Sequence, residues 1–170
     1  MKIKIGRKSY IANPAMITLI RYIAEFHESF LSAYLEGTCG ALELVRLVWS
    51  SIDSPKPDFE EFLEAAAESK GFAAAAQSIQ AAVLATPEIR KRSASTGNVE
   101  KTDEIDILAL MTIAGVDVGL IHVLPVFYIT EIASRKTSML SGKISDKKGG
   151  QKRRFYLMSD AEIREEYGRR

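Results

Sequence analysis

The sequence has one cysteine and two histidines in 170 residues. A single cysteine, Cys39, excludes a disulfide within the chain and favours a reducing compartment. One cysteine and two histidines also cannot supply the four ligands of a zinc site built from these residue types. We therefore expect no metal and no cofactor, with both histidines in structural or exposed positions.

Long apolar runs are also missing. The longest segments without a charged residue, 107–116 and 118–130, fall short of the roughly 20 residues that a membrane-spanning helix needs. The first residues alternate between polar and apolar types and do not form the continuous apolar stretch of a signal peptide. The sequence predicts a cytoplasmic protein with no membrane partner.

Signatures of catalysis are absent as well. His27 and Glu28 begin a metalloprotease-like pattern, but that pattern needs a second histidine at the position of Leu31. Gly142 and Lys143 lack the other residues of a phosphate-binding loop. No serine or cysteine lies in a recognised nucleophile motif. We expect a protein that is not an enzyme and has no catalytic residues.

What the sequence does contain is hydrophobic periodicity. With 46% hydrophobic and 26% charged residues, the chain has the composition of a folded protein. Residues 1–12 alternate with a period of two around a Gly6-Arg7-Lys8 turn, which predicts a β-hairpin. Because an isolated hairpin is marginally stable in water, its Ile3 and Ile5 face is expected to lie on helices.

Three-four apolar spacing follows and predicts helices. The first is expected to run as one long amphipathic helix from Pro14 to Tyr34, capped by Asn13, with Thr18 on its polar side. Gly37 is expected to end it.

Three more helices are predicted before residue 86. One covers 42–52, the next is capped by Asp58, and the last covers 72–84 after a stop at Gly71. This last helix is rich in alanine, and its small side chains would let a neighbouring helix approach closely.

Periodicity is lost over residues 86–103, which predicts a linker. It separates a hairpin-plus-four-helix domain, 1–85, from a small apolar helical module, 104–140. A basic tail, 141–170, follows, in which Ser159–Glu162 has the spacing of a capping box and predicts a short helix. The expected fold is mostly α, with an N-terminal β-hairpin packed on a helical bundle, then the helical module and the basic tail.

The densest apolar stretch is 104–135. It is expected to form a helix over 104–114, a short piece capped by Asp117 and a helix opened by Pro125. The first of these is apolar on two faces, and both need cover. The stretch is either an ordinary helical core or a surface that binds a partner helix through apolar anchors. The partner-binding candidates are Ile107, Leu110, Met111, Leu124, Pro125, Phe127, Tyr128 and Ile132.

The tail is the basic end of the chain. Residues 141–170 hold nine Lys/Arg and five Asp/Glu, whereas residues 1–85 hold eight and ten. The tail is either a solvated extension or a site for nucleic acid phosphates or an acidic partner, with Phe155 and Tyr156 available for stacking. The acidic first domain would repel phosphates, which argues against nucleic acid. The basic candidates are Lys147, Lys148, Lys152, Arg153 and Arg154.

Several segments stand in a fixed order along residues 1–85. They are the hairpin Met1–Tyr10, a long apolar helix, the segment Leu44–Trp49, a proline-containing turn and the segment Asp58–Leu63. In this order the chain resembles the tail assembly chaperones of long-tailed bacteriophages. The second half, with its Ala114–Asp117 turn and Leu124-Pro125 helix start, resembles the extension that such chaperones often gain by programmed ribosomal frameshifting.

The resemblance implies a non-structural protein of the host cytoplasm. Such a chaperone binds the helical tape measure protein, keeps it soluble and helps to recruit tail tube subunits. The first domain is associated with tube-protein recruitment and homo-oligomerisation, and the extension with tape measure binding. The basic residues 147–154 depart from the family's pattern. Two other functions remain open: a small nucleic-acid-binding regulatory protein that uses the tail, and a helical virion or connector component.

Overall fold

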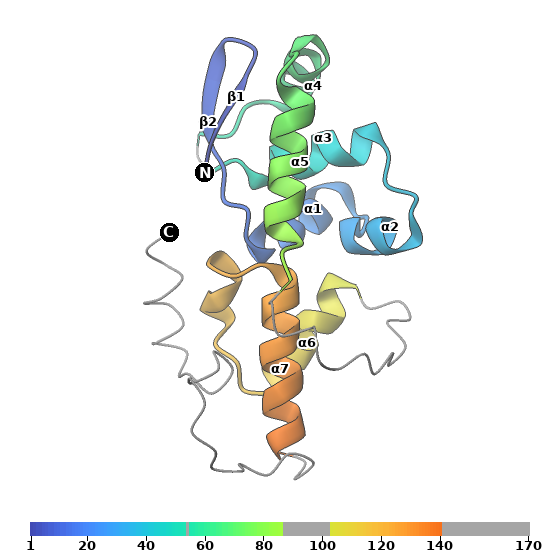
Figure 1. The fold of residues 1–170 in the computed structure, drawn as a ribbon, viewed down its shortest axis with the longest axis vertical. Coiled ribbons are helices and arrows are strands. Elements are labelled where there is room, and N and C mark those ends of the chain that lie inside the picture. The colour runs from blue at the N-terminus through green and yellow to red at the C-terminus, as the bar shows by residue number, and fades with distance from the viewer. Residues whose placement is uncertain (54, 87–102, 141–170) are drawn as a thin grey trace.

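The structure is a computed structural model, and it describes residues 1–53, 55–86 and 103–140. The described chain is mostly helical and begins with a two-stranded antiparallel hairpin (Figure 1). The expected fold class is thereby confirmed. The predicted tail with its short helix lies outside the described residues, as does nearly all of the predicted linker. No helix in the described ranges is long and apolar enough to cross a membrane.

The helices form two parts that lie end to end in Figure 1. The elements are α1 (Met16–Phe26), α2 (Phe30–Glu36), α3 (Ala41–Ser51), α4 (Phe59–Glu68), α5 (Phe72–Val83), α6 (Glu104–Ile113), η2 (Val118–His122) and α7 (Val126–Leu140). Helix α1 packs on α3, and α3 packs on α4 and α5, whereas α6 packs on α7 below them. The 3₁₀ helix η2 contacts α1 and so joins the two parts.

The hairpin covers one side of the upper part. Strands β1 (Lys2–Ile5) and β2 (Lys8–Ile11) pair in antiparallel register, and the turn is closed by Gly6 at a φ of 58°, which glycine adopts without steric cost. Ile3 and Ile5 are buried, and β1 contacts α5. The expectation that this face lies on helices is confirmed.

The predicted single helix from Pro14 to Tyr34 is wrong, because the chain forms two helices there. Helix α1 ends at Phe26, and His27 follows in the left-handed conformation with a φ of 55°. Ser29 then caps α2, and its side chain accepts a hydrogen bond from the N–H of Ser32. A capping serine starts a new helix here, although the apolar spacing continues through the break.

The start of α1 also differs from the prediction. Asn13 does not cap the helix, and its side-chain amide donates to the carbonyl of His122 over 3.1 Å. Thr18, predicted on the polar side, is fully buried, and its hydroxyl donates a hydrogen bond to the carbonyl of Asn13. The N–H of Met16 donates to the carbonyl of Leu124 over 2.9 Å. The N-terminal end of α1 is therefore completed by the second half of the chain.

The other predicted helix starts agree with the structure. The side chain of Asp58 accepts hydrogen bonds from two N–H groups of the first turn of α4. Gly71 stands at the N-cap of α5, and the side chain of Asp117 accepts a hydrogen bond from the N–H of Gly119 in η2. Helix α7 begins directly after Pro125.

One apolar core runs through both parts. Buried side chains form a single cluster that extends from the hairpin to α7. In the upper part, Phe26, Trp49 and Phe59 contact one another, with ring centroids 5.1 to 5.7 Å apart. In the lower part, Ile107 and Met111 of α6 are buried in the same cluster. The two parts of the described chain share this core.

Candidate partner-binding surfaces

A buried carboxylate joins α6 to α2. Glu104 at the start of α6 is fully buried, and its carboxylate accepts hydrogen bonds from the hydroxyl of Ser29 over 2.6 Å and from the N–H of Leu31 over 2.9 Å. Unpaired N–H groups at a helix start attract negative charge, so this position at the N-terminus of α2 suits a carboxylate. Residues 104–140 are thus held on the upper part by polar contacts as well as by the shared core.

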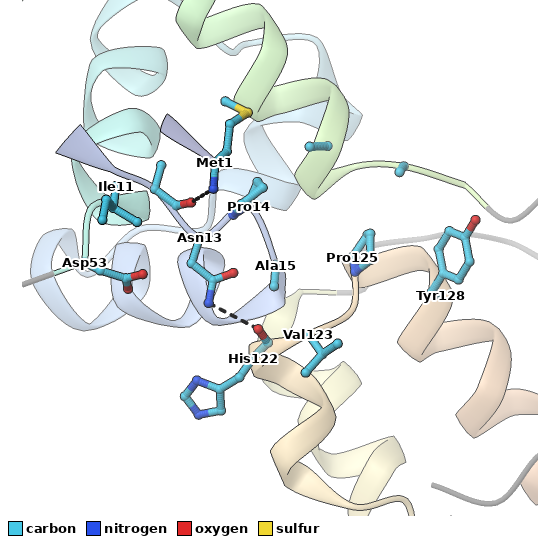
Figure 2. Close-up of a pocket in the computed structure, with 13 residues that line it drawn as sticks. Met1, Ile11, Asn13, Pro14, Ala15, Asp53, His122, Val123, Pro125 and Tyr128 are labelled. Atoms are coloured by element: carbon cyan, nitrogen blue, oxygen red, sulfur yellow. Dashed lines mark hydrogen bonds between the residues drawn. The ribbon is translucent and has the colours of Figure 1, made fainter. Parts of the chain in front are cut away.

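An open pocket lies where the two parts meet (Figure 2). It has a volume of about 770 Å³, and its lining comes from the hairpin, the start of α1, the end of α5 and the start of α7. Two of the predicted partner-binding residues, Pro125 and Tyr128, line it. Of the lining residues, Asp53 is acidic, and its carboxylate is paired with Arg21 at 3.0 Å. The other lining residues are mostly apolar, and His122 and Asn13 add polar groups.

Helix α6 is apolar on two faces, as the sequence predicts. Ile107 on the inner face is 2% exposed, whereas Ile105 and Ile113 on the outer face are 58% and 72% exposed. Ala109 lies between these two isoleucines on the outer face and is exposed as well. Because residues four apart on a helix are neighbours, the three form one apolar stripe, which we call the outer face of α6.

The predicted partner-binding residues fall into two groups. Four are buried in the protein's own core: Ile107, Met111, Leu124 and Ile132. The other four are partly buried: Leu110, Pro125, Phe127 and Tyr128. A partner that used the first group would have to displace part of the core. The predicted basic candidates between Lys147 and Arg154 lie outside the described residues.

A second apolar surface was not predicted as a site. It is a groove of about 450 Å³ between α3, α4 and α5. Leu42 of α3 and Leu63 of α4 stand in it and are 43% and 37% exposed, and Phe72 and alanines of α4 and α5 complete the walls. The signal in the sequence was the alanine-rich stretch of α5, which pointed to close approach of a helix but not to an open groove.

Two partly buried groups, Lys56 and Cys39, have shifted pKa values. Burial lowers the pKa of Lys56, whose ammonium lies 3.4 Å from the centre of the Trp49 ring and 3.6 Å from the carboxylate of Glu25. Burial, followed by the nearby charge of Glu43, raises the pKa of the Cys39 thiol. Because the thiolate is the reactive form, a raised pKa makes Cys39 a poor nucleophile at neutral pH.

Metal ligands do not gather in the described ranges. Within residues 1–53, 55–86 and 103–140, no three His, Cys, Asp or Glu side chains lie close enough together to hold a metal ion.

Comparison of the chain with protein-family models, with curated proteins and with solved structures finds no match.

Proposed function

We propose that this protein is a tail assembly chaperone of a long-tailed bacteriophage. In this role it binds apolar helices of the tape measure protein in the host cytoplasm and keeps that protein soluble. The observation that carries the proposal is the two-sided character of α6, whose inner face packs on the core while Ile105 and Ile113 remain exposed. The order of motifs in residues 1–85, which resembles that of the family, supplies the identity of the partner.

The outer face of α6 has the spacing that a partner helix requires. Ile105, Ala109 and Ile113 follow one another at four-residue intervals, which is the pattern of helix-to-helix recognition. Full burial of an isoleucine side chain is worth about 1.5–3 kcal/mol, so a helix that covers this stripe gains affinity from both isoleucines.

The position of α6 favours binding because the helix is fixed before the partner arrives. Asp103 and Asp106 form a capping box at its start, and the buried carboxylate of Glu104 holds it on α2. A surface that is already ordered loses less conformational entropy on binding. The first domain, by the family resemblance, takes part in recruiting tail tube subunits and in homo-oligomerisation.

Co-expression with the tape measure protein of the same phage tests the proposal. The fraction of tape measure protein that stays soluble should rise when the full chain is present. A double variant, Ile105→Asp with Ile113→Asp, should lose this effect, since aspartate on the outer face opposes apolar contact. Leu35→Asp on α2 is the matched control, because Leu35, like the two isoleucines, is an exposed aliphatic residue but lies on another helix.

Two results would contradict the proposed chaperone function. The first is a tape measure protein whose solubility does not depend on this chain. The second is the presence of the chain in stoichiometric amounts in purified virions, which would favour a virion component.

A further inference from the structure

The groove between α3, α4 and α5 has walls made of small side chains. Ala66 and Ala67 line it from α4, and Ala73 and Ala76 line it from α5. The distance between packed helices depends on the side chains at the contact, and small ones permit close approach. Leu42 and Leu63 stand in the groove as larger, partly exposed apolar groups. The groove therefore has the lining of a helix-packing surface.

One edge of the groove is acidic. Glu60 and Glu64 precede the groove residues Leu63 and Ala67 by three positions each on α4, and residues three apart on a helix are neighbours. Both glutamates are exposed. Among the described residues, neither takes part in an ion pair.

The basic groups near the groove do not offset this charge. Arg46 of α3 is held by Glu28 at 2.7 Å, and α5 carries no charged residue. Lys70 stands in the turn between α4 and α5 and is exposed. Glu68, also exposed, lies two positions before it. The edge along α4 keeps its negative charge.

From these features we infer that the groove binds an amphipathic helix of a partner protein whose apolar stripe is flanked by lysine or arginine. The apolar stripe would pack on the alanines and leucines, and its basic flank would lie beside Glu60 and Glu64. Opposite charges across an interface select the partner and fix its orientation. This inference goes beyond the proposed function, since it concerns a surface other than the outer face of α6.

A second copy of this chain is a poor match for the groove. The most exposed apolar helix face in the described chain is the outer face of α6. That helix has an exposed acidic residue in its first turn, Asp106, and no basic residue, whereas its Glu104 is buried against α2. It would therefore bring negative charge toward Glu60 and Glu64.

Two synthetic peptides test the inference with the full-length protein. Both form a helix of about 18 residues, or five turns, with the same stripe of leucine and alanine. One carries lysine and arginine beside the stripe, and the other carries glutamate at the same positions. Binding is followed by fluorescence anisotropy of the labelled peptide. The basic peptide should bind about tenfold or more tightly than the acidic one, and less tightly as salt is added.

Variants locate the binding. Leu63→Asp should abolish it, and Glu60→Lys with Glu64→Lys should reverse the preference between the two peptides. Ala73→Gln, which places a longer neutral side chain in the groove, gives a second test if Leu63→Asp does not fold. Leu35→Asp is the control and should leave binding unchanged.

The inference is overturned if both peptides bind equally or if neither binds. It is also overturned if Leu35→Asp weakens binding as much as Leu63→Asp. Self-association of the full chain that Leu63→Asp abolishes would assign the groove to a second copy instead. Peptide binding should be unchanged in the Ile105→Asp, Ile113→Asp variant. That result would show that the groove binds the peptide independently of the outer face of α6, on which the chaperone proposal rests.

Discussion

The carboxylate of Glu104 accepts a hydrogen bond from the N–H of Leu31, which lies 73 positions earlier in the chain. The same carboxylate accepts a hydrogen bond from the hydroxyl of Ser29, the residue that caps α2. A side chain from the second half of the protein thus completes the start of a helix in the first half. Since Glu104 is fully buried, this contact is shielded from water and is a main polar link between the two parts.

Glu104→Ala should lower the free energy of unfolding by about 2–3 kcal/mol, because it leaves a buried N–H and a hydroxyl without their charged acceptor. Glu104→Gln should cost less, since an acceptor oxygen remains. Urea denaturation followed by the fluorescence of Trp49, the single tryptophan, measures both. The control is Glu60→Ala at an exposed site, which should change stability by less than about 0.5 kcal/mol. Equal losses in the Glu104→Ala and control variants would contradict the prediction.

Truncation of two isoleucines of α6 should have very different effects on stability. Ile107→Ala should cost about 2–5 kcal/mol, because it removes buried methylene and methyl groups and leaves a cavity. Ile105→Ala, on the outer face, should change stability by less than about 0.5 kcal/mol. Thermal or urea unfolding of the two variants gives the comparison. Similar costs would mean that the outer face is covered in the folded protein.

His27→Gly should stabilise the protein. His27 holds a φ of 55°, a conformation that costs a residue with a Cβ about 1–2 kcal/mol, while glycine loses part of that gain through the entropy of the unfolded chain. The expected net gain is up to about 1 kcal/mol. Ala24→Gly, at an exposed position inside α1, is the matched control and should instead cost about 1 kcal/mol. A loss of stability in both variants would contradict the left-handed conformation at His27.

Cys39 should titrate at higher pH in the folded protein than in the unfolded chain. Burial and the charge of Glu43 raise its pKa, so the pH midpoint of its alkylation by iodoacetamide should be higher in buffer than in concentrated urea. Between the two pKa values the folded state keeps a proton that the unfolded state releases. Cys39 therefore makes stability fall as the pH rises through that window. Coinciding midpoints would refute the prediction.

Signals confined to a few residues predicted four of the helix starts. Asp58, Gly71, Asp117 and Pro125 mark the beginnings of α4, α5, η2 and α7, because caps act within one turn. The break at His27 was missed although Ser29, a local cap, marks the start of α2, because the apolar spacing continues across it. Phe30 follows it and continues the apolar spacing, and it is burial of that ring against Tyr22 that fits the second helix into the core.

The candidate surfaces could be predicted only in part from the sequence, because they depend on contacts between residues that are distant along the chain. The sequence predicted that α6 has two apolar faces but not which of them is covered. Glu104 has the appearance of an ordinary acidic residue in a helix's first turn, since its partners Ser29 and Leu31 lie far away in sequence. The groove combines side chains of three helices between Ala41 and Gln77, and no local pattern joins them.

The hydrogen bond from the N–H of Met16 to the carbonyl of Leu124 affects when α1 can complete its folding during synthesis. At about 5–20 residues per second, a ribosome needs several seconds to pass from the first of these residues to the second. During that interval the first turn of α1 lacks this acceptor, and the face of α1 that contacts η2 is uncovered. The first helix to be synthesised is therefore among the last to reach its final surroundings. Until then, its uncovered face is open to contact with other proteins.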